Sequence, residues 1–239
     1  MAAHSGDNAA PMTNFHVISI GTLARNTLWN EGTAVRTAHA TTTLIEGDDA
    51  LILIDPSLPP QVLAARLHER CGKQPGDITH VFCTGFSDTH VGGIAAFPEA
   101  IWLCSEVEFE NAHEAIDDNL VAAQEHGDAA GMEAMECLKV IHARMRPCPD
   151  SIVDGVDLFP LPGIRPGSAG LLLPQTRRTV LIAGDAVATN GHLHAGQVLP
   201  ECFNREQAME SFKEAIEIAD VIVPGRDNVT INPLRPGLL

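Results

Sequence analysis

Residues 82–93, with the sequence FCTGFSDTHVGG, hold the densest group of side chains that could do chemistry. Ser87, Asp88 and His90 lie within four positions, just before a Gly pair that could open a helix. An imidazole can act as a general base or bind a metal ion, while hydroxyl and carboxylate groups can bind a ligand. The segment therefore carries a candidate site for a metal, a small-molecule ligand or acid–base catalysis.

Charged residues also follow two later apolar runs. Asp185 comes after TVLIAG, and Arg226 and Asp227 come after VIVPG. Both runs are rich in β-branched and aliphatic residues, which predicts buried strands. We expect these three residues to lie just beyond strand ends.

The composition argues against several classes of partner. The chain has 239 residues, a formal net charge of −16 and 4% aromatic residues, with no Tyr. This charge opposes binding to nucleic acid or anionic membranes, because both depend on clustered Lys and Arg. No apolar stretch approaches the roughly 20 residues that cross a bilayer, and the six scattered Cys favour reduced thiols. We expect a cytoplasmic protein with no nucleic-acid partner and no membrane partner.

The first half of the chain alternates strand and helix signals. FHVISIG and TTTLIEGDDALILIDP predict an antiparallel start, with EGDD as a hairpin turn. A helix should follow, because Leu63, Leu67 and Cys71 share one helical face and Gly72 can end it. ITHVFCTG and AIWLC predict two further strands.

A helical stretch is expected in residues 105–145. Ser105 and Glu108 form a capping-box pattern at its start. Gly127 and Gly131 are the expected breaks, so the stretch should form two helices.

The last third of the chain returns to strands. SIVDGVDLFPLPG, GSAGLLLP, RRTVLIAGD and VIVPG predict strands, and NREQAMESFKEAIEIA predicts a helix capped by Asn204 with Gln207 at the capping-box position. This order of elements suits helices packed outside two facing sheets. We expect a flexible N-terminal arm in residues 1–14 and a single domain in residues 15–239.

Five segments, in this order, resemble the metallo-β-lactamase superfamily over residues 15–228. They are LILIDPSL, ITHVFCTGFSDTHVGG, PLPGIRPGSAGLLL, TVLIAGDAV and VIVPGRDN. The resemblance implies an α/β fold, a four-layer αββα sandwich of two mixed sheets with helices outside, and hydrolase ancestry. An ordinary doubly wound α/β domain is the alternative, although the chain has no GxGxxG or Walker-type loop to support nucleotide binding.

Most of the family's metal-ligand positions carry no ligand here. The family motif Thr-His-x-His-x-Asp-His begins at Thr84, and its ligand positions fall on Gly85, Ser87, Thr89 and His90. The two later His positions fall on Ile164 and Arg226, and the bridging Asp falls on Asp185. Only His90 and Asp185 keep ligand chemistry, whereas a catalytic zinc site needs about three protein ligands plus water. We expect a lost dinuclear site and no metal cofactor.

Without metal ions, Asp185 needs another counter-charge, because an unpaired buried carboxylate costs several kcal/mol. We predict an ion pair between Arg226 and Asp185, with His90 nearby. Arg165 is a second candidate counterion. The alternatives are that Arg226 is a solvated loop residue and that His90 is an early-helix residue bonded to backbone. Asp55 is expected to fix a strand-end turn.

A remodelled metal site is the rival prediction. A loop shift could bring Asp88, His90, Asp185 and Asp227 together around one divalent ion. Such an oxygen-rich set suits Mn²⁺, Mg²⁺ or Fe²⁺ better than zinc, so one divalent metal (Mn, Fe or Zn) is the alternative cofactor.

Two weaker candidates lie close to these segments. His192 and His194, in GHLHAG, are expected in a surface loop near the rim of the cleft. Cys83 is expected to be inert packing on a buried strand, and the alternative is a nucleophile with His90 as its base.

Two functions stay open. The first is a non-catalytic protein that binds a ligand or has a regulatory role, with a small molecule as its expected partner and a homo-oligomer as an open alternative. Its ligand-binding residues would be Arg226, Ser87, Asp88 and Asp227. The second is a hydrolase of an ester, lactone, thioester or phosphodiester, with one metal or none, that uses His90 and Asp185 as catalytic residues.

Overall fold

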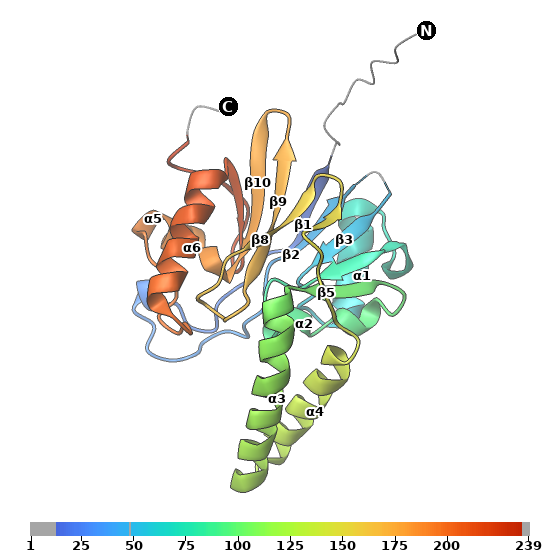
Figure 1. The fold of residues 1–239 in the computed structure, drawn as a ribbon, viewed down its shortest axis with the longest axis vertical. Helices are drawn as coiled ribbons and strands as arrows, with labels where there is room; N and C mark the ends of the chain where they lie inside the picture. Colours follow the sequence, from blue (N-terminus) through green and yellow to red (C-terminus); the bar gives the residue numbers. More distant parts are fainter. Residues whose placement is uncertain (1–12, 48, 236–239) are drawn as a thin grey trace.

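Two mixed sheets of six strands each form the centre of the computed structural model, which describes residues 13–47 and 49–235 (Figure 1). The first sheet contains β1 (Asn14–Ser19), β2 (Thr42–Glu46), β3 (Leu51–Ile54), β4 (His80–Phe82), β5 (Ile101–Cys104) and β6 (Arg146–Pro147), in that order. The pairs β1–β2 and β2–β3 are antiparallel, and β3 to β6 run parallel. The predicted hairpin is thus confirmed.

The second sheet contains the C-terminal strands. They are β7 (Ser151–Val153), β8 (Val156–Pro160), β9 (Ala169–Gln175), β10 (Arg178–Gly184), β11 (Val221–Pro224) and β12 (Thr230–Ile231). All neighbouring pairs are antiparallel except β10 and β11. Because α6 connects β10 to β11, these two strands can run parallel and end at the same edge.

Helices lie outside the two sheets and at their edge (Figure 1). The α-helices are α1 (Pro60–Cys71), α2 (Asp88–Val91), α3 (Glu106–His126), α4 (Ala129–His142), α5 (Asn190–Ala195) and α6 (Arg205–Ile218). Short 3-10 helices are η1 (Thr27–Trp29), η2 (Pro75–Asp77), η3 (Ile94–Ala96) and η4 (Asp185–Val187). In the described part of the chain, none of the helices is both long and apolar enough to cross a bilayer.

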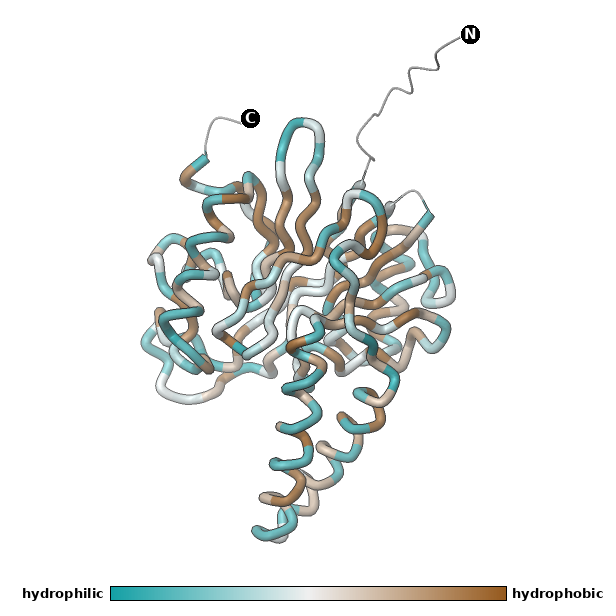
Figure 2. The backbone as a smooth tube through the Cα atoms, viewed as in Figure 1, coloured by the Kyte–Doolittle hydropathy of each residue, from teal (hydrophilic) through white to brown (hydrophobic). Residues whose placement is uncertain are grey.

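Strand alternation builds the layers, because successive side chains of a strand point to opposite faces of the sheet. Phe82 packs between the sheets, whereas Val81 joins Leu63 of α1 on the outer face. In the second sheet, Leu181 contacts the outer cluster that contains Phe212 of α6. The brown strands at the centre of Figure 2 show this apolar interior. The predicted arrangement of two facing mixed sheets with outer helices is confirmed.

The helices α3 and α4 form a hairpin that projects away from the sheets (Figure 1). Both predicted helices are present, and the break between them is at Gly127, whose φ of 65° ends α3. Gly131 is not a break, because its N–H donates to the Asp128 side chain within the first turn of α4. The hairpin connects the end of β5 to the start of β6.

One predicted boundary and one predicted loop are wrong. The predicted arm of residues 1–14 is too long, because Asn14 already pairs with Glu46 and Thr13 is buried; residues 1–12 lie outside the described residues. GHLHAG is not a loop but contributes most of α5, which Thr189 caps by accepting the His192 N–H at 3.2 Å.

Candidate functional site

The site residues follow the ends of strands from both sheets. Thr84 lies two residues beyond β4, Asp185 directly follows β10, and Arg226 lies two residues beyond β11. The two sheets meet here, since the Ala169 N–H of β9 donates to the Thr84 carbonyl at 3.0 Å. Strand ends from separate parts of the sequence therefore place these side chains together.

Arg226 and Asp185 form the predicted ion pair. Nε of Arg226 donates to Oδ1 of Asp185 at 2.7 Å, and Nη2 donates to Oδ2 at 2.7 Å. The Arg226 side chain is 6% exposed and that of Asp185 is 11% exposed. Two parallel charge-assisted bonds in a buried position are the geometry that guanidinium groups favour with carboxylates. Nη1 of Arg226 is buried without a hydrogen-bond partner among the described residues.

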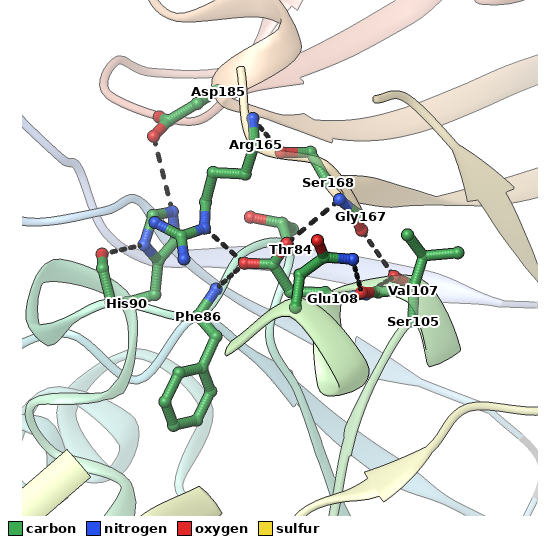
Figure 3. A network of polar contacts seen from close by, with 12 residues as sticks. Thr84, Phe86, His90, Ser105, Val107, Glu108, Arg165, Gly167, Ser168 and Asp185 are labelled. Carbon is green, nitrogen blue, oxygen red and sulfur yellow. Dashed lines mark hydrogen bonds and ion pairs between the residues drawn. The ribbon is translucent and has the colours of Figure 1, made fainter. Parts of the chain in front are cut away.

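His90 lies beside this pair, as predicted. Its Nε2 is 3.5 Å from Oδ2 of Asp185 and 3.4 Å from Nη2 of Arg226. Figure 3 shows the imidazole reaching from α2 toward Asp185. The Nδ1 side of the ring faces Ser87, with Oγ of Ser87 at 2.8 Å. His90 is 3% exposed and bonds to side chains through both ring nitrogens, so the alternative of a ring bonded to backbone is wrong.

The charge of Asp185 depends on its neighbours. Burial alone would raise the pKa of the Asp185 carboxyl, but the charge and hydrogen bonds of Arg226, together with His90, hold that pKa far below its usual range. Asp185 is therefore ionised at neutral pH.

Thr89 was assigned only as a lost ligand position, but the structure gives it a contact in the site. Its Oγ1 accepts a hydrogen bond from Nη2 of Arg226 at 3.0 Å and lies 3.0 Å from Oγ of Ser87. No signal in the sequence indicates these contacts, because they depend on the turn of α2 and on a residue 137 positions away.

A buried carboxylate, Glu108, anchors the segment before α2. Its two oxygens accept the Phe86 N–H at 2.7 Å and the Gly167 N–H at 3.2 Å, and Nε of Arg165 bonds to it as well (Figure 3). Ser105 caps α3 as predicted by accepting the Glu108 N–H at 3.1 Å. The reciprocal half of the capping box is absent, because the Glu108 carboxylate has these other partners.

One alternative gave Arg165 as a counterion of Asp185. That alternative is wrong. Arg165 pairs with Glu108, which is 1% exposed and needs a counter-charge. The terminal guanidinium nitrogens of Arg165 make no hydrogen bond within the residues that the structure describes.

Gly85 stands where the family motif has its first metal ligand, and its surroundings leave little room for a side chain. A Cβ atom at this position would lie 3.0 Å from Cδ of Arg165 and 3.6 Å from Nε2 of His90. The Arg165 chain thus packs directly against the place from which a ligand at residue 85 would extend.

Asp55 fixes a strand-end turn, as predicted. It has a φ of 48°, and its carboxylate accepts the Thr84 N–H at 2.8 Å and the Thr84 hydroxyl at 2.7 Å. Burial raises the pKa of this carboxyl, although Thr84 and the nearby His90 oppose the rise. The contact joins the ends of β3 and β4 beneath the site.

The remodelled metal set of Asp88, His90, Asp185 and Asp227 is not assembled. The Asp88 side chain is exposed and accepts the Thr89 N–H at 2.8 Å. The Asp227 carboxylate accepts the Asn190 N–H at 3.0 Å, at the start of α5. Within residues 13–47 and 49–235, no three His, Cys, Asp or Glu side chains come together in a way that could hold a metal. The side chains of Asp88, His90, Asp185 and Asp227 therefore do not fit a metal ion.

A cavity of about 490 Å³ opens between α2 and the α3–α4 hairpin. Its polar lining includes Ser87, Asp88 and Arg165, and its remaining lining is mostly apolar, with Phe86 before α2 and Leu138 of α4 among the side chains. We call this space the α2 cavity. Its volume lies within the roughly 300–1,000 Å³ of small-molecule sites. Arg226 and Asp227 line a separate and smaller space of about 150 Å³.

The remaining candidates lie away from the α2 cavity. His192 is buried, so its assignment to a surface loop is wrong, whereas His194 is exposed. Cys83 is 1% exposed in the outer core cluster, and burial raises the pKa of its thiol well above the usual value. A thiol that is inaccessible and protonated does not act as a nucleophile.

Comparison with known proteins identifies the family. The model of the metallo-beta-lactamase superfamily matches residues 36–226, a range that includes the whole site. This chain belongs to the metallo-beta-lactamase superfamily. A Mycobacterium tuberculosis protein named as a metallo-hydrolase is 29% identical over 204 residues, which cover 71% of this chain and 63% of that protein. This chain thus spans less than two thirds of that relative. Metallo-beta-lactamase domain-containing protein 1 of Xenopus laevis is 29% identical over 191 residues, covering 79% of this chain and 70% of that one.

Solved structures of the superfamily share the fold. A Thermotoga maritima protein named as a metallo-beta-lactamase has a TM-score of 0.67 at 17% identity, covering 92% of this chain and 99% of that one. AidC, named as a dizinc quorum-quenching lactonase, has a TM-score of 0.63 at 18% identity, covering 87% of this chain and 80% of that one. At such identities the likeness establishes the fold only.

Proposed function

We propose that this chain is a metal-independent member of its superfamily that binds a small molecule in the α2 cavity, in a ligand-binding or regulatory role. The observation that supports this most directly is the bidentate contact between Arg226 and both oxygens of Asp185. Asp185 is the main carboxylate left for a metal, and both of its oxygens already bond to a cation.

The charge balance supports the same conclusion. A divalent ion beside Asp185 would lie next to the permanently charged Arg226, and the two cations would repel each other. His90 and Asp185 supply two donors where a catalytic zinc site needs about three protein ligands. Arg165 packs against Gly85, so one vacated ligand position is also filled sterically.

The α2 cavity supports the ligand-binding part of the proposal. Its apolar lining from α3 and α4 favours an apolar group, because burial of apolar surface contributes roughly 25 cal/mol per Å². Ser87 and the free guanidinium nitrogens of Arg165 offer donors to an uncharged acceptor such as a carbonyl. Asp88 and the net charge of −16 disfavour anionic ligands.

Metal analysis tests the metal-independent part. Protein purified without chelator should hold only trace metal, and a calorimetric zinc titration should show no tight binding. The variant Arg226→His adds an imidazole beside His90 and Asp185 and removes the guanidinium, so it should bind zinc more tightly than the wild type. Arg178→His, at an exposed position, is the control. Stoichiometric tight zinc in the wild type would contradict the proposal.

A second candidate is metal-free hydrolysis of an ester, lactone, thioester or phosphodiester with His90 and Asp185. The contact of 2.8 Å between Oγ of Ser87 and Nδ1 of His90 favours it. AidC is named as a lactonase with two zinc ions, and that zinc chemistry has no counterpart in these residues. A panel of such substrates, assayed with excess chelator, separates the candidates: turnover lost in His90→Ala supports the hydrolase, and no turnover supports ligand binding.

A further inference from the structure

The hydroxyl of Ser87 has the contacts of an activated nucleophile. Its Oγ lies 2.8 Å from Nδ1 of His90 and 3.0 Å from Oγ1 of Thr89. A hydroxyl is a weak nucleophile unless an adjacent base removes its proton. The direction of the Ser87–His90 hydrogen bond therefore decides whether His90 can act as that base.

The contacts of Arg226 favour one direction. Nη2 carries two hydrogens and has two near acceptors, Oδ2 of Asp185 at 2.7 Å and Oγ1 of Thr89 at 3.0 Å. Nε2 of His90 is farther away, at 3.4 Å, so no hydrogen of Nη2 is left for it. The neighbouring acceptor for Nε2 is Oδ2 of Asp185, at 3.5 Å. His90 is therefore assigned the tautomer with its hydrogen on Nε2.

This tautomer leaves a lone pair on Nδ1 of His90, which accepts the Ser87 hydroxyl. The Thr89 hydroxyl, which accepts from Arg226, donates in turn to Oγ of Ser87. The donors then run in one direction, from Arg226 through Thr89 and Ser87 to Nδ1 of His90, while Nε2 of His90 faces Oδ2 of Asp185 at 3.5 Å. Apart from Nη1 of Arg226, which has no partner among the described residues, these contacts are consistent with one another, and His90 is aligned as a base with the Ser87 hydroxyl.

The α2 cavity supplies a place for a substrate. Ser87 is partly exposed and lines this cavity, so a molecule there can reach its hydroxyl. Arg165 lines it too, and its terminal nitrogens are free to stabilise an oxygen that gains negative charge. The apolar lining on α3 and α4 suits the hydrocarbon part of an acyl group.

From these contacts we propose that Ser87 is the nucleophile of a metal-independent acyl transfer, with His90 as general base, acting on esters or thioesters whose acyl group enters the α2 cavity. The proposal rests on the metal-independent site proposed above and deepens the second candidate function, metal-free hydrolysis, by naming its nucleophile and the part of the substrate that enters the α2 cavity. Asp185 orients His90 and takes up no proton in the reaction.

The reaction balances with water as co-reactant. Oγ of Ser87 bonds to the acyl carbon while its proton moves to Nδ1 of His90. The bond from carbon to the leaving oxygen or sulfur breaks, and the leaving group takes this proton as an alcohol or thiol. Water then attacks the acyl–Ser87 ester, gives a proton to His90, and releases the carboxylic acid as Ser87 regains its proton.

Covalent labelling tests the proposal with a probe that reacts with activated serine hydroxyls in general. An alkyl fluorophosphonate should phosphonylate Ser87 with loss of fluoride, in protein kept in excess chelator, and peptide mass spectrometry should locate the adduct. The adduct should be absent in Ser87→Ala and retained in Ser151→Ala, which removes an exposed hydroxyl on β7. In His90→Gln the labelling rate should fall by about 10²-fold, the lower range for a general base.

Two further variants keep the test decisive. In Ser87→Cys the new thiol should react with iodoacetamide faster than the exposed Cys137, and His90→Gln should remove this advantage. Ala115→Trp, which fills the cavity, should slow labelling by long-chain fluorophosphonates, whereas Ala122→Trp on the same helix should not.

The outcomes separate this proposal from the function on which it rests. No adduct at Ser87 in folded, metal-free protein, or the same labelling rate in His90→Gln, would overturn the nucleophile alone. Labelling that requires an added divalent ion would overturn the metal-independent site as well.

Discussion

Arg226 provides a fixed positive charge for a carboxylate that burial would otherwise drive toward the neutral form. Desolvation raises the pKa of a buried carboxyl, and a bidentate guanidinium more than reverses this for Asp185. Because guanidinium groups stay protonated, the pair cannot be neutralised by a proton transfer. Such a pair is expensive to break, since removal of one partner leaves the other charge buried.

Arg226→Gln should therefore lower the free energy of unfolding by about 3–5 kcal/mol, because Asp185 loses its counter-charge. Urea denaturation followed by circular dichroism measures this loss. Asp185→Asn in the same chain should recover part of it, since the two effects are coupled. Arg178→Gln, which loses an exposed contact to Gln175, should change stability by less than about 0.5 kcal/mol. An equal effect of both Arg substitutions would contradict the buried pair.

The thiols give a second prediction at the scale of residues. Burial raises the pKa of Cys104 to about 12 and that of Cys148 to about 12, and Cys83 is likewise raised. Cys137 is exposed. A thiol reagent at neutral pH should modify Cys137 quickly and the three buried thiols only after unfolding, as counted by mass spectrometry. Cys137→Ser should remove one thiol from those modified in the native state, where the partly exposed Cys71 and Cys202 can also react, and fast modification of Cys83 in the native state would refute the assignment.

At the scale of elements, contacts between distant segments hold the site in place. Glu108 in the first turn of α3 accepts N–H groups from Phe86 and Gly167, so it joins the loop before α2 to the loop before β9. The N-terminus of α6 also packs closely on the segment after β8, where Gly163 has a φ of 123°. These contacts fix the angles at which helices meet the sheet edge.

Gly163→Ala should be strongly destabilising. A Cβ atom at this position would lie 2.1 Å from the backbone nitrogen of Ala208, so α6 would have to move, and the φ of 123° disfavours any side chain. We expect a loss of about 3 kcal/mol or more in the free energy of unfolding. Gly76→Ala, where a Cβ meets nothing within 4 Å, is the matched control. Equal unfolding midpoints for the two variants would show that α6 does not pack in this way.

At the scale of the whole molecule, the two facing sheets and outer helices bury or partly bury titratable groups outside the α2 cavity. Burial lowers the pKa of His192 in α5 and that of His80 in β4. Each group therefore binds a proton more readily in the unfolded chain than in the folded one. The stability associated with these two residues is fully present above the unfolded pKa of about 6.5 and is lost progressively as the pH falls from there through the lower pKa of the folded state.

Thermal unfolding should show this pH dependence. We expect the midpoint to fall as the pH decreases from about 6.5 to about 5, with His80 and His192 contributing to the slope. The double variant His80→Gln/His192→Gln should flatten the slope in this window, whereas His194→Gln, an exposed neighbour in α5, should leave it unchanged. An unchanged slope in the double variant would show that these two residues are not the cause.

The sequence by itself determined the longer elements and their layers, because local apolar periodicity and capping residues act over a few positions. Leu63 and Leu67 on one face of α1, and the Asn204 cap of α6, follow from residue types and spacing alone. The shortage of ligand chemistry at Gly85, Ile164 and Arg226 was also visible from residue types. This shortage led to the prediction that Arg226 forms an ion pair with Asp185.

Only the tertiary structure decided which partner each charged side chain takes. Arg165 pairs with Glu108 and not with Asp185, and Asp227 turns to the start of α5 and away from His90. The contact of Arg226 with Thr89, and through it with Ser87, also required the folded chain. The physical reason is that hydrogen bonds and ion pairs act over about 3 Å, whereas these partners lie tens of residues apart and meet only where strand ends of two sheets converge.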